Sequence, residues 1–263
     1  MQTSPTARTV RLAASLLVAL FGTGAWAGPI ELLPHRAAYR VTLADNGRGG
    51  AVTAVQGGLV LEWRAECEGW ISNQRLGFVA ATAEGPGFTY DVRFTSWESR
   101  DNTQLRFSVR SFDDGKPGEE YRGQAALEAP GGKGVALFAL PEESRLELPP
   151  GTIFPTEHVK RLIAAAEAGE RVVTHSVFDG SGKDALSTVS AVIGASREVD
   201  GTRRWPVRLA YFGAGNNDAT PDFAIGFELD RRGVLHDITL DYGEFVLKGR
   251  LDRLEPLPTP DCR

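Results

Sequence analysis

The sequence predicts a mainly β protein built on a single curved antiparallel sheet, an open barrel or β-spiral, with one central α-helix packed on its concave side. Three observations lead to this fold class. Apolar and polar residues alternate in about a dozen stretches, which is typical of half-buried strands. Turn dipeptides such as Asn46-Gly47 and Asp114-Gly115 separate these stretches. Only the stretch 149–169 has convincing helical periodicity.

The expected strands lie on both sides of this helix. His35–Leu43 and Phe88–Glu98 show the alternation most clearly. The other expected strands are 51–67, 70–82, 104–112, 120–128, 135–140, 171–178, 186–195, 205–212, 223–230, 234–241 and 244–254. No link between the strands before the helix and those after it is long or polar enough to separate domains. We therefore expect one continuous sheet; the alternative fold is two β-sandwiches. Strong curvature would also cover exposed strand edges.

The expected helix covers about residues 155–168. Pro155 suits the first turn, where its missing N–H has no intrahelical partner. Gly169 is placed to end the helix as a C′ glycine. A helix of about three turns is not stable alone, so its apolar stripe must dock on the sheet. That stripe, at positions i, i+3, i+4 and i+7, consists of Val159, Leu162, Ile163 and Ala166.

Residues 1–27 have the features of a secretory signal peptide. Arg8 and Arg11 precede the apolar run Leu12–Phe21, and Ala25-Trp26-Ala27 forms an A-x-A cleavage site. The apolar run is too short to span a membrane, which disfavours the alternative of an N-terminal anchor. We therefore expect export to the periplasm, cleavage after Ala27, and a mature single domain over residues 28–263 with a β-spiral fold.

The charge of the mature chain disfavours some partners. The whole sequence has a net charge of −5, and loss of the two leader arginines makes the mature chain more acidic still. No basic run interleaved with aromatic residues remains, so we expect no nucleic-acid partner. No later stretch approaches the length of a transmembrane helix, so we expect no integral membrane span.

Two cysteines, Cys67 and Cys262, are present in the chain. In an oxidising compartment a single pair most simply forms one disulfide, which would close a loop of about 195 residues. Two separate thiols are the alternative. Cys262 lies in the Pro-rich tail 255–263, and a disulfide would tie down a tail that otherwise frays.

The helix entry and the cysteine placement together resemble a known family. One cysteine is early, one lies next to the C-terminus, and Phe154-Pro155-Thr156-Glu157-His158 enters an alanine-rich helix. In these features the chain resembles the EipB family of periplasmic cell-envelope-integrity proteins, over residues 32–262, which is nearly the whole mature chain. The resemblance implies a β-spiral fold, a disulfide between Cys67 and Cys262, and a role in maintaining the envelope under stress. It transfers no catalytic residue.

Candidate catalytic and metal-binding residues are few. Glu157 and His158 are neighbours, and neighbours on a helix do not face each other. We interpret Glu157 as interacting favourably with the positive N-terminal end of the helix dipole. We interpret His158 as capping the helix or packing on the sheet. His35, His175 and His236 lie in expected strands. A three-histidine zinc site stays open by spacing, but the sequence lacks H-x-H and H-E-x-x-H. We expect no catalytic residue, metal or cofactor.

Several aromatic residues mostly fall at core-facing positions of the expected strands. A curved sheet that is incompletely filled would let some of them line an apolar cleft, which makes lipid or acyl-chain binding plausible. The residues concerned are Trp63, Trp70, Trp97, Phe88, Tyr90, Phe94 and Phe107.

The leading functional hypothesis is a non-enzymatic periplasmic protein that supports cell-envelope integrity by binding an envelope protein, a lipoprotein or a lipid. One alternative is a periplasmic carrier of acyl chains or lipoproteins, which needs an apolar cavity. A second alternative is an envelope hydrolase that uses His158.

Overall fold

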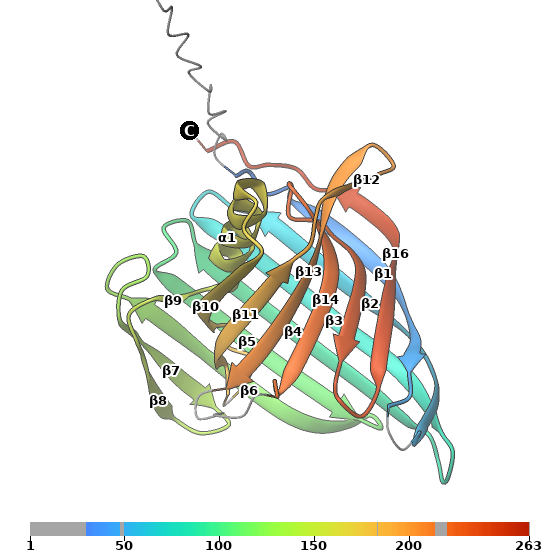
Figure 1. The fold of residues 1–263 in the computed structure, drawn as a ribbon. Coiled ribbons are helices and arrows are strands. Elements are labelled where there is room, and N and C mark those ends of the chain that lie inside the picture. The colour runs from blue at the N-terminus through green and yellow to red at the C-terminus, as the bar shows by residue number, and fades with distance from the viewer. Residues whose placement is uncertain (1–29, 48–49, 183, 214–219, 263) are drawn as a thin grey trace, which may run out of the picture.

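The computed structural model describes residues 30–47, 50–182, 184–213 and 220–262. The expected signal peptide lies outside the described residues. Within them, sixteen strands belong to one sheet, and there is one helix, α1, Pro155–Ala168 (Figure 1). The strands are β1 His35–Asp45, β2 Val52–Ala65, β3 Gly69–Thr82, β4 Phe88–Ser99, β5 Gln104–Asp113, β6 Lys116–Leu127, β7 Gly134–Leu140, β8 Ser144–Leu148, β9 Thr152–Ile153, β10 Val172–Phe178, β11 Leu186–Ile193, β12 Arg197–Val199, β13 Thr202–Gly213, β14 Phe223–Asp230, β15 Leu235–Asp241 and β16 Val246–Pro256.

The sheet extends to both sides of β1, which lies near its middle. β1 pairs with β2 on one side and β16 on the other; the order then runs out to β8 at one end and to β9 at the other. These two end strands follow each other in the chain, joined by the turn 149–151. The covalent chain therefore closes the nearly complete barrel at the point where the described strands form no hydrogen-bonded ladder.

The predicted single curved sheet is confirmed, with one exception to its antiparallel order. β9 and β10 pair in parallel, because α1 connects them as a crossover and parallel neighbours require such a connection. Three short strands, β8, β9 and β12, were not expected from the sequence; they contain five, two and three residues. Alternation over so few residues is too weak a signal to indicate a strand.

The interior of the described sheet contains two clusters of buried apolar side chains. The larger one includes the helix stripe residues Leu162 and Ile163 with inner-face residues of strands from both halves of the chain. The smaller one lies under β5–β7, where the rings of Phe107, Phe138 and Phe178 meet edge to face at centroid distances of 5.3 to 6.3 Å. Phe154, fully buried just before α1, belongs to the smaller cluster.

α1 begins and ends as its sequence predicts. Pro155 is the first helical residue, and Gly169 adopts a left-handed conformation with φ of 79°. The N–H of Glu170 donates to the Ala165 carbonyl at 2.9 Å, which is the bonding of a glycine-ended helix. The buried stripe of α1 faces the interior, so the helix contributes to the core on the concave side of the sheet.

A disulfide joins Cys67, in the turn between β2 and β3, to Cys262 in the tail that follows β16. The Cα atoms are 5.4 Å apart. The tail is also held by the N–H of Leu257, which donates to the Pro34 carbonyl at 2.8 Å. The tail is therefore attached to the β2–β3 turn beyond the last ladder of the sheet.

Loss of this disulfide is predicted to destabilise the protein. Because the bond spans 195 residues, loop-closure entropy sets an upper limit of about 5 kcal/mol on its contribution. Urea unfolding of Cys262→Ser should show a lower free energy of unfolding, whereas the tail control Thr259→Ser should match the wild type. Two free thiols in non-reducing mass mapping of periplasmic protein, or an equally stable Cys262→Ser, would contradict this.

Candidate functional site

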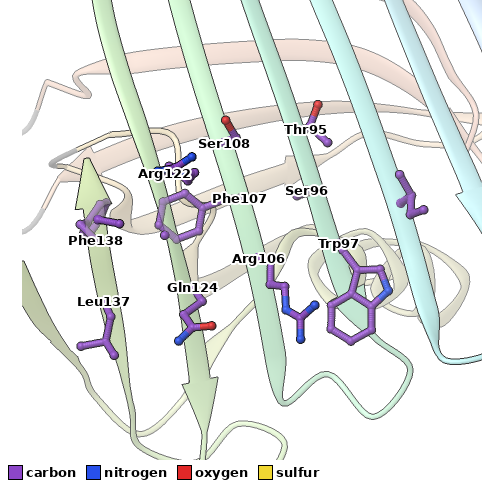
Figure 2. A pocket seen from close by; sticks show the side chains of 13 residues that line it. Thr95, Ser96, Trp97, Arg106, Phe107, Ser108, Arg122, Gln124, Leu137 and Phe138 are labelled. Carbon is purple, nitrogen blue, oxygen red and sulfur yellow. The ribbon is translucent and has the colours of Figure 1, made fainter. Parts of the chain in front are cut away.

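The candidate functional site is a groove of about 580 Å³ that crosses the outer face of β3 to β7. Alternate residues of these strands point inward and are buried, as Leu105 and Phe107 are in β5, while Arg106 between them is exposed. The groove lies among the outward-pointing residues (Figure 2).

The strand register explains why this surface is hollowed. One row across the strands carries long side chains: Ile71, Trp97, Arg106, Gln124 and Leu137. The next row carries shorter ones over β4 and β5, Thr95 and Ser108, and continues to Arg122 on β6. A third row is long again, with Arg93 and Arg110. Short side chains between two long rows leave a trough that crosses the strands.

A glycine lies among the residues that line the groove. Gly123 occupies an inward-facing position of β6, and a Cβ there would lie 2.6 Å from the Phe107 ring and 2.3 Å from the Leu137 carbonyl oxygen. Its missing side chain lets the strands and the Phe107 ring approach closely. Phe107 and Phe138, which belong to the buried cluster, also line the groove.

Two arginines of the groove differ from the others on the outer face of β1–β8. The remaining strand arginines there each form an ion pair with a carboxylate; they are Arg36, Arg40, Arg64, Arg75, Arg93, Arg110 and Arg145. Arg106 and Arg122 have no such partner among the described residues. Arg106 instead lies over the Trp97 ring, 5.1 Å from its centroid. The groove therefore presents two positive charges without a carboxylate partner on an acidic protein.

Trp97 is the exception among the aromatic residues that were expected mostly at core-facing positions. Ser96 and Glu98, on either side of it, are buried in the interior, so the period of two places Trp97 on the outer face. Its cross-strand partners are Ile71 and Arg106. The alternation that places Tyr90 and Phe94 inward places Trp97 on the opposite face.

The helix entry is held by a carboxylate that sequence reasoning missed. Glu98 of β4 is buried, and its Oε1 accepts hydrogen bonds from the Thr156 N–H at 3.0 Å and the Thr156 hydroxyl at 2.7 Å. Phe154, the N-cap residue, makes no side-chain cap, so Glu98 satisfies a free N–H of α1 from another element. The sequence feature that could have revealed Glu98 is a charged residue at a core-facing position of a strand. Burial raises the pKa of Glu98 to about 7.

Glu157 and His158 are not an acid–base pair. Glu157 binds Arg161 at 2.9 Å and the Asn102 amide at 3.0 Å. His158 is buried and packs edge-on against His175, with ring centroids 5.4 Å apart. Burial, with smaller effects of His175 and Arg161, lowers the pKa of His158 to about 3. His158 thus packs on the sheet as expected, and it does not cap the helix.

The four histidines lie in two separate places. His236 Nε2 is 3.4 Å from Oδ2 of buried Asp230, which also binds Arg232 at 3.0 Å. His35, nearby on β1, donates from Nδ1 to the Leu33 carbonyl oxygen at 2.7 Å, and burial lowers its pKa. Among the described residues no group of three or more histidine, cysteine or acidic side chains could hold a metal ion. The structure does not bring three histidines together.

The curved sheet closed by one helix and carrying this outer groove defines a β-spiral, barrel-like protein. The chain belongs to the EipB-like family, whose model matches residues 26–258. It is 34% identical over 248 residues to the cell envelope integrity protein EipB of Brucella abortus, covering 89% of this chain and 88% of that protein. It is also similar to a crystal structure of a beta-barrel-like protein of a domain of unknown function from Brucella abortus. The TM-score is 0.81 and the identity 33%, over 87% of this chain and 100% of the other.

Glu98→Gln is predicted to change the pH dependence of stability. A folded-state pKa of about 7, above the ordinary 4.5, means that Glu98 costs stability progressively as pH rises from 4.5 through 7. The lowered pKa of His158 acts oppositely, because its stabilising effect is lost as pH falls from 6.5 towards 3. The histidine effect is the same in both proteins and cancels when they are compared. Removing the cost of Glu98 should therefore raise the stability of the variant relative to wild type by about 3 kcal/mol between pH 4.5 and 7.5.

Urea unfolding at several pH values measures this difference. Glu62→Gln is the matched control, because the ion pairs of Glu62 with Arg36 and Arg64 lower its pKa despite opposing desolvation; the stability difference of this variant should stay constant above pH 4.5. If the stability difference between Glu98→Gln and wild type also stays constant above pH 4.5, Glu98 is not protonated near neutral pH.

Proposed function

We propose that the chain is a periplasmic, non-enzymatic protein that supports cell-envelope integrity by binding an envelope protein or lipoprotein in its outer groove. The observation that carries the proposal is the 34% identity to a protein named for envelope integrity, over nearly the whole of both chains. The expected signal peptide and cleavage site agree with an envelope location. No helix in the described residues is long and apolar enough to cross a membrane.

The groove is the best-supported binding surface, because it combines concavity with unpaired charge. It exposes Trp97 and Leu137, the latter 41% exposed, beside the guanidinium groups of Arg106 and Arg122. Tryptophan and arginine are the side chains that most often dominate binding energy at interfaces. An envelope lipid is a further candidate occupant, since the groove offers apolar surface next to cations.

The alternative of an acyl-chain carrier receives less support. It needs an apolar interior that can be emptied, whereas the inner faces of the described strands carry two packed clusters of side chains. The stripe of α1 occupies the concave side, where a carried chain would lie.

The alternative of a hydrolase that uses His158 also receives less support. A general base works best with a pKa near the ambient pH, and that of His158 is lowered to about 3. We predict that His158→Gln, which removes the imidazole and keeps a polar side chain, restores a deletion strain as well as wild type does at equal protein abundance. Loss of rescue by a folded, abundant His158→Gln protein would support the hydrolase instead.

Complementation tests the proposed function directly. Deletion of the gene should raise sensitivity to detergent, and the wild-type gene should restore resistance. The double variant Arg106→Gln/Arg122→Gln should fail to restore it at equal abundance, because the groove then lacks both unpaired cations. Arg40→Gln is the matched control: Arg40 is an outer-face arginine of β1 paired with Asp252 at 2.9 Å. Unchanged detergent sensitivity of the deletion strain, or full rescue by the double variant, would contradict the proposal.

A further inference from the structure

We propose that the groove binds an acidic peptide segment in extended conformation, with carboxylates two residues apart pairing with Arg106 and Arg122. This inference rests on the proposed function and names the chemical class of its partner. It is carried by the register of β5 and β6 and by the charges of the outer face.

The spacing of the two arginines fits such a segment. Arg106 pairs with Gln124, and Ser108 pairs with Arg122, so the arginines are diagonal neighbours on adjacent strands. Diagonal positions of this kind are about 8 Å apart. In an extended chain, side chains at i and i+2 share one face about 7 Å apart. Two acidic residues separated by one other residue therefore reach both guanidinium groups at once.

The chemistry of the two side chains selects a carboxylate. A guanidinium presents a planar fork of donors that matches a carboxylate in bidentate geometry. Arg106 is further fixed by stacking on Trp97, which reduces the entropy lost when a ligand binds. Along the trough, the Ser108 hydroxyl can donate to or accept from a peptide backbone. The Thr95 hydroxyl, which donates to Asn73 Oδ1 at 3.1 Å, can accept from one. Leu137, on one side of the same trough, offers a contact for an apolar residue of the peptide (Figure 2).

The surroundings of the groove favour a narrow chain over a charged membrane surface. Next to the trough, Arg93 pairs with Asp91 at 2.9 Å, and Arg110 pairs with Glu120. A bilayer of anionic lipids would cover these carboxylates too and would gain attraction from only two unpaired cations. An extended peptide that lies in the trough meets the two cations and avoids the neighbouring carboxylates.

Fluorescence anisotropy with the full mature protein tests the proposal. The probe is the fluorescein-labelled peptide Leu-Ser-Glu-Ser-Glu-Ser-Leu, and its matched control replaces both glutamates by glutamine. We expect binding of the acidic probe that weakens with added salt, and no measurable binding of the glutamine probe. Arg106→Gln and Arg122→Gln should each weaken binding about tenfold or more, as loss of a charged hydrogen bond does, whereas Arg40→Gln should leave it unchanged.

A second variant separates charge from shape. Ser108→Phe places a ring in the trough without changing any charge, and it should abolish binding of the acidic probe while circular dichroism shows an intact fold. Equal binding of both probes, equal weakening by Arg40→Gln, or no effect of Ser108→Phe would overturn the proposal. Binding to anionic phospholipid vesicles that is lost in Arg122→Gln, without binding of the acidic probe, would overturn the peptide in favour of a lipid.

The two proposals fail in different ways. If the acidic probe does not bind, yet Arg106→Gln/Arg122→Gln still fails to restore the deletion strain, the groove keeps its function and the acidic peptide is wrong as its ligand. If the double variant restores detergent resistance fully, the groove is not needed for envelope integrity, whatever the peptide measurement shows.

Discussion

The docking of α1 inside the curved sheet is the interaction on which the rest of the structure depends. β8 and β9 end the sheet without pairing to each other, so backbone hydrogen bonds do not hold the two ends together. The turn 149–151 joins these strands covalently, and side chains of the helix and its entry contact both clusters. Phe154 packs into the cluster under β5–β7, while Leu162 and Ile163 pack into the larger cluster. Glu98 of β4 fixes the first turn by accepting the Thr156 N–H. The helix and the residue that precedes it, Phe154, thus contact both cores.

The same packing shapes the outer groove. The inner sides of β5, β6 and β7 carry Phe107, Gly123 and Phe138, and the close approach at Gly123 depends on the position of the Phe107 ring. A second glycine, Gly180, also lies against that ring and has a left-handed φ of 74°, so the loop after β10 packs on it from the inside. The groove therefore lies on the outer side of β5–β7, and the helix entry packs against the inner side of the same strands.

Much of the fold could be predicted from the sequence, because periodicity is a local property. Alternation located the long strands, and Pro155, the apolar stripe and Gly169 located the helix. Pairing of Cys67 with Cys262 agreed with the family resemblance. The groove could not be predicted, since it depends on which residues of β3 to β7 stand side by side, and register is not local. For the same reason the link between Glu98 and Thr156, 58 residues apart, was missed.

Native-state hydrogen exchange of an Ile163→Ala variant tests most directly whether α1 joins the two cores. Ile163 is fully buried in the larger cluster, and removal of its side chain should weaken the docking of α1. If the helix holds both clusters together, protection should fall in α1, in β5–β7 and in β10–β11 by similar amounts of opening free energy. Faster exchange confined to α1, with unchanged protection in β5–β7, would contradict this account.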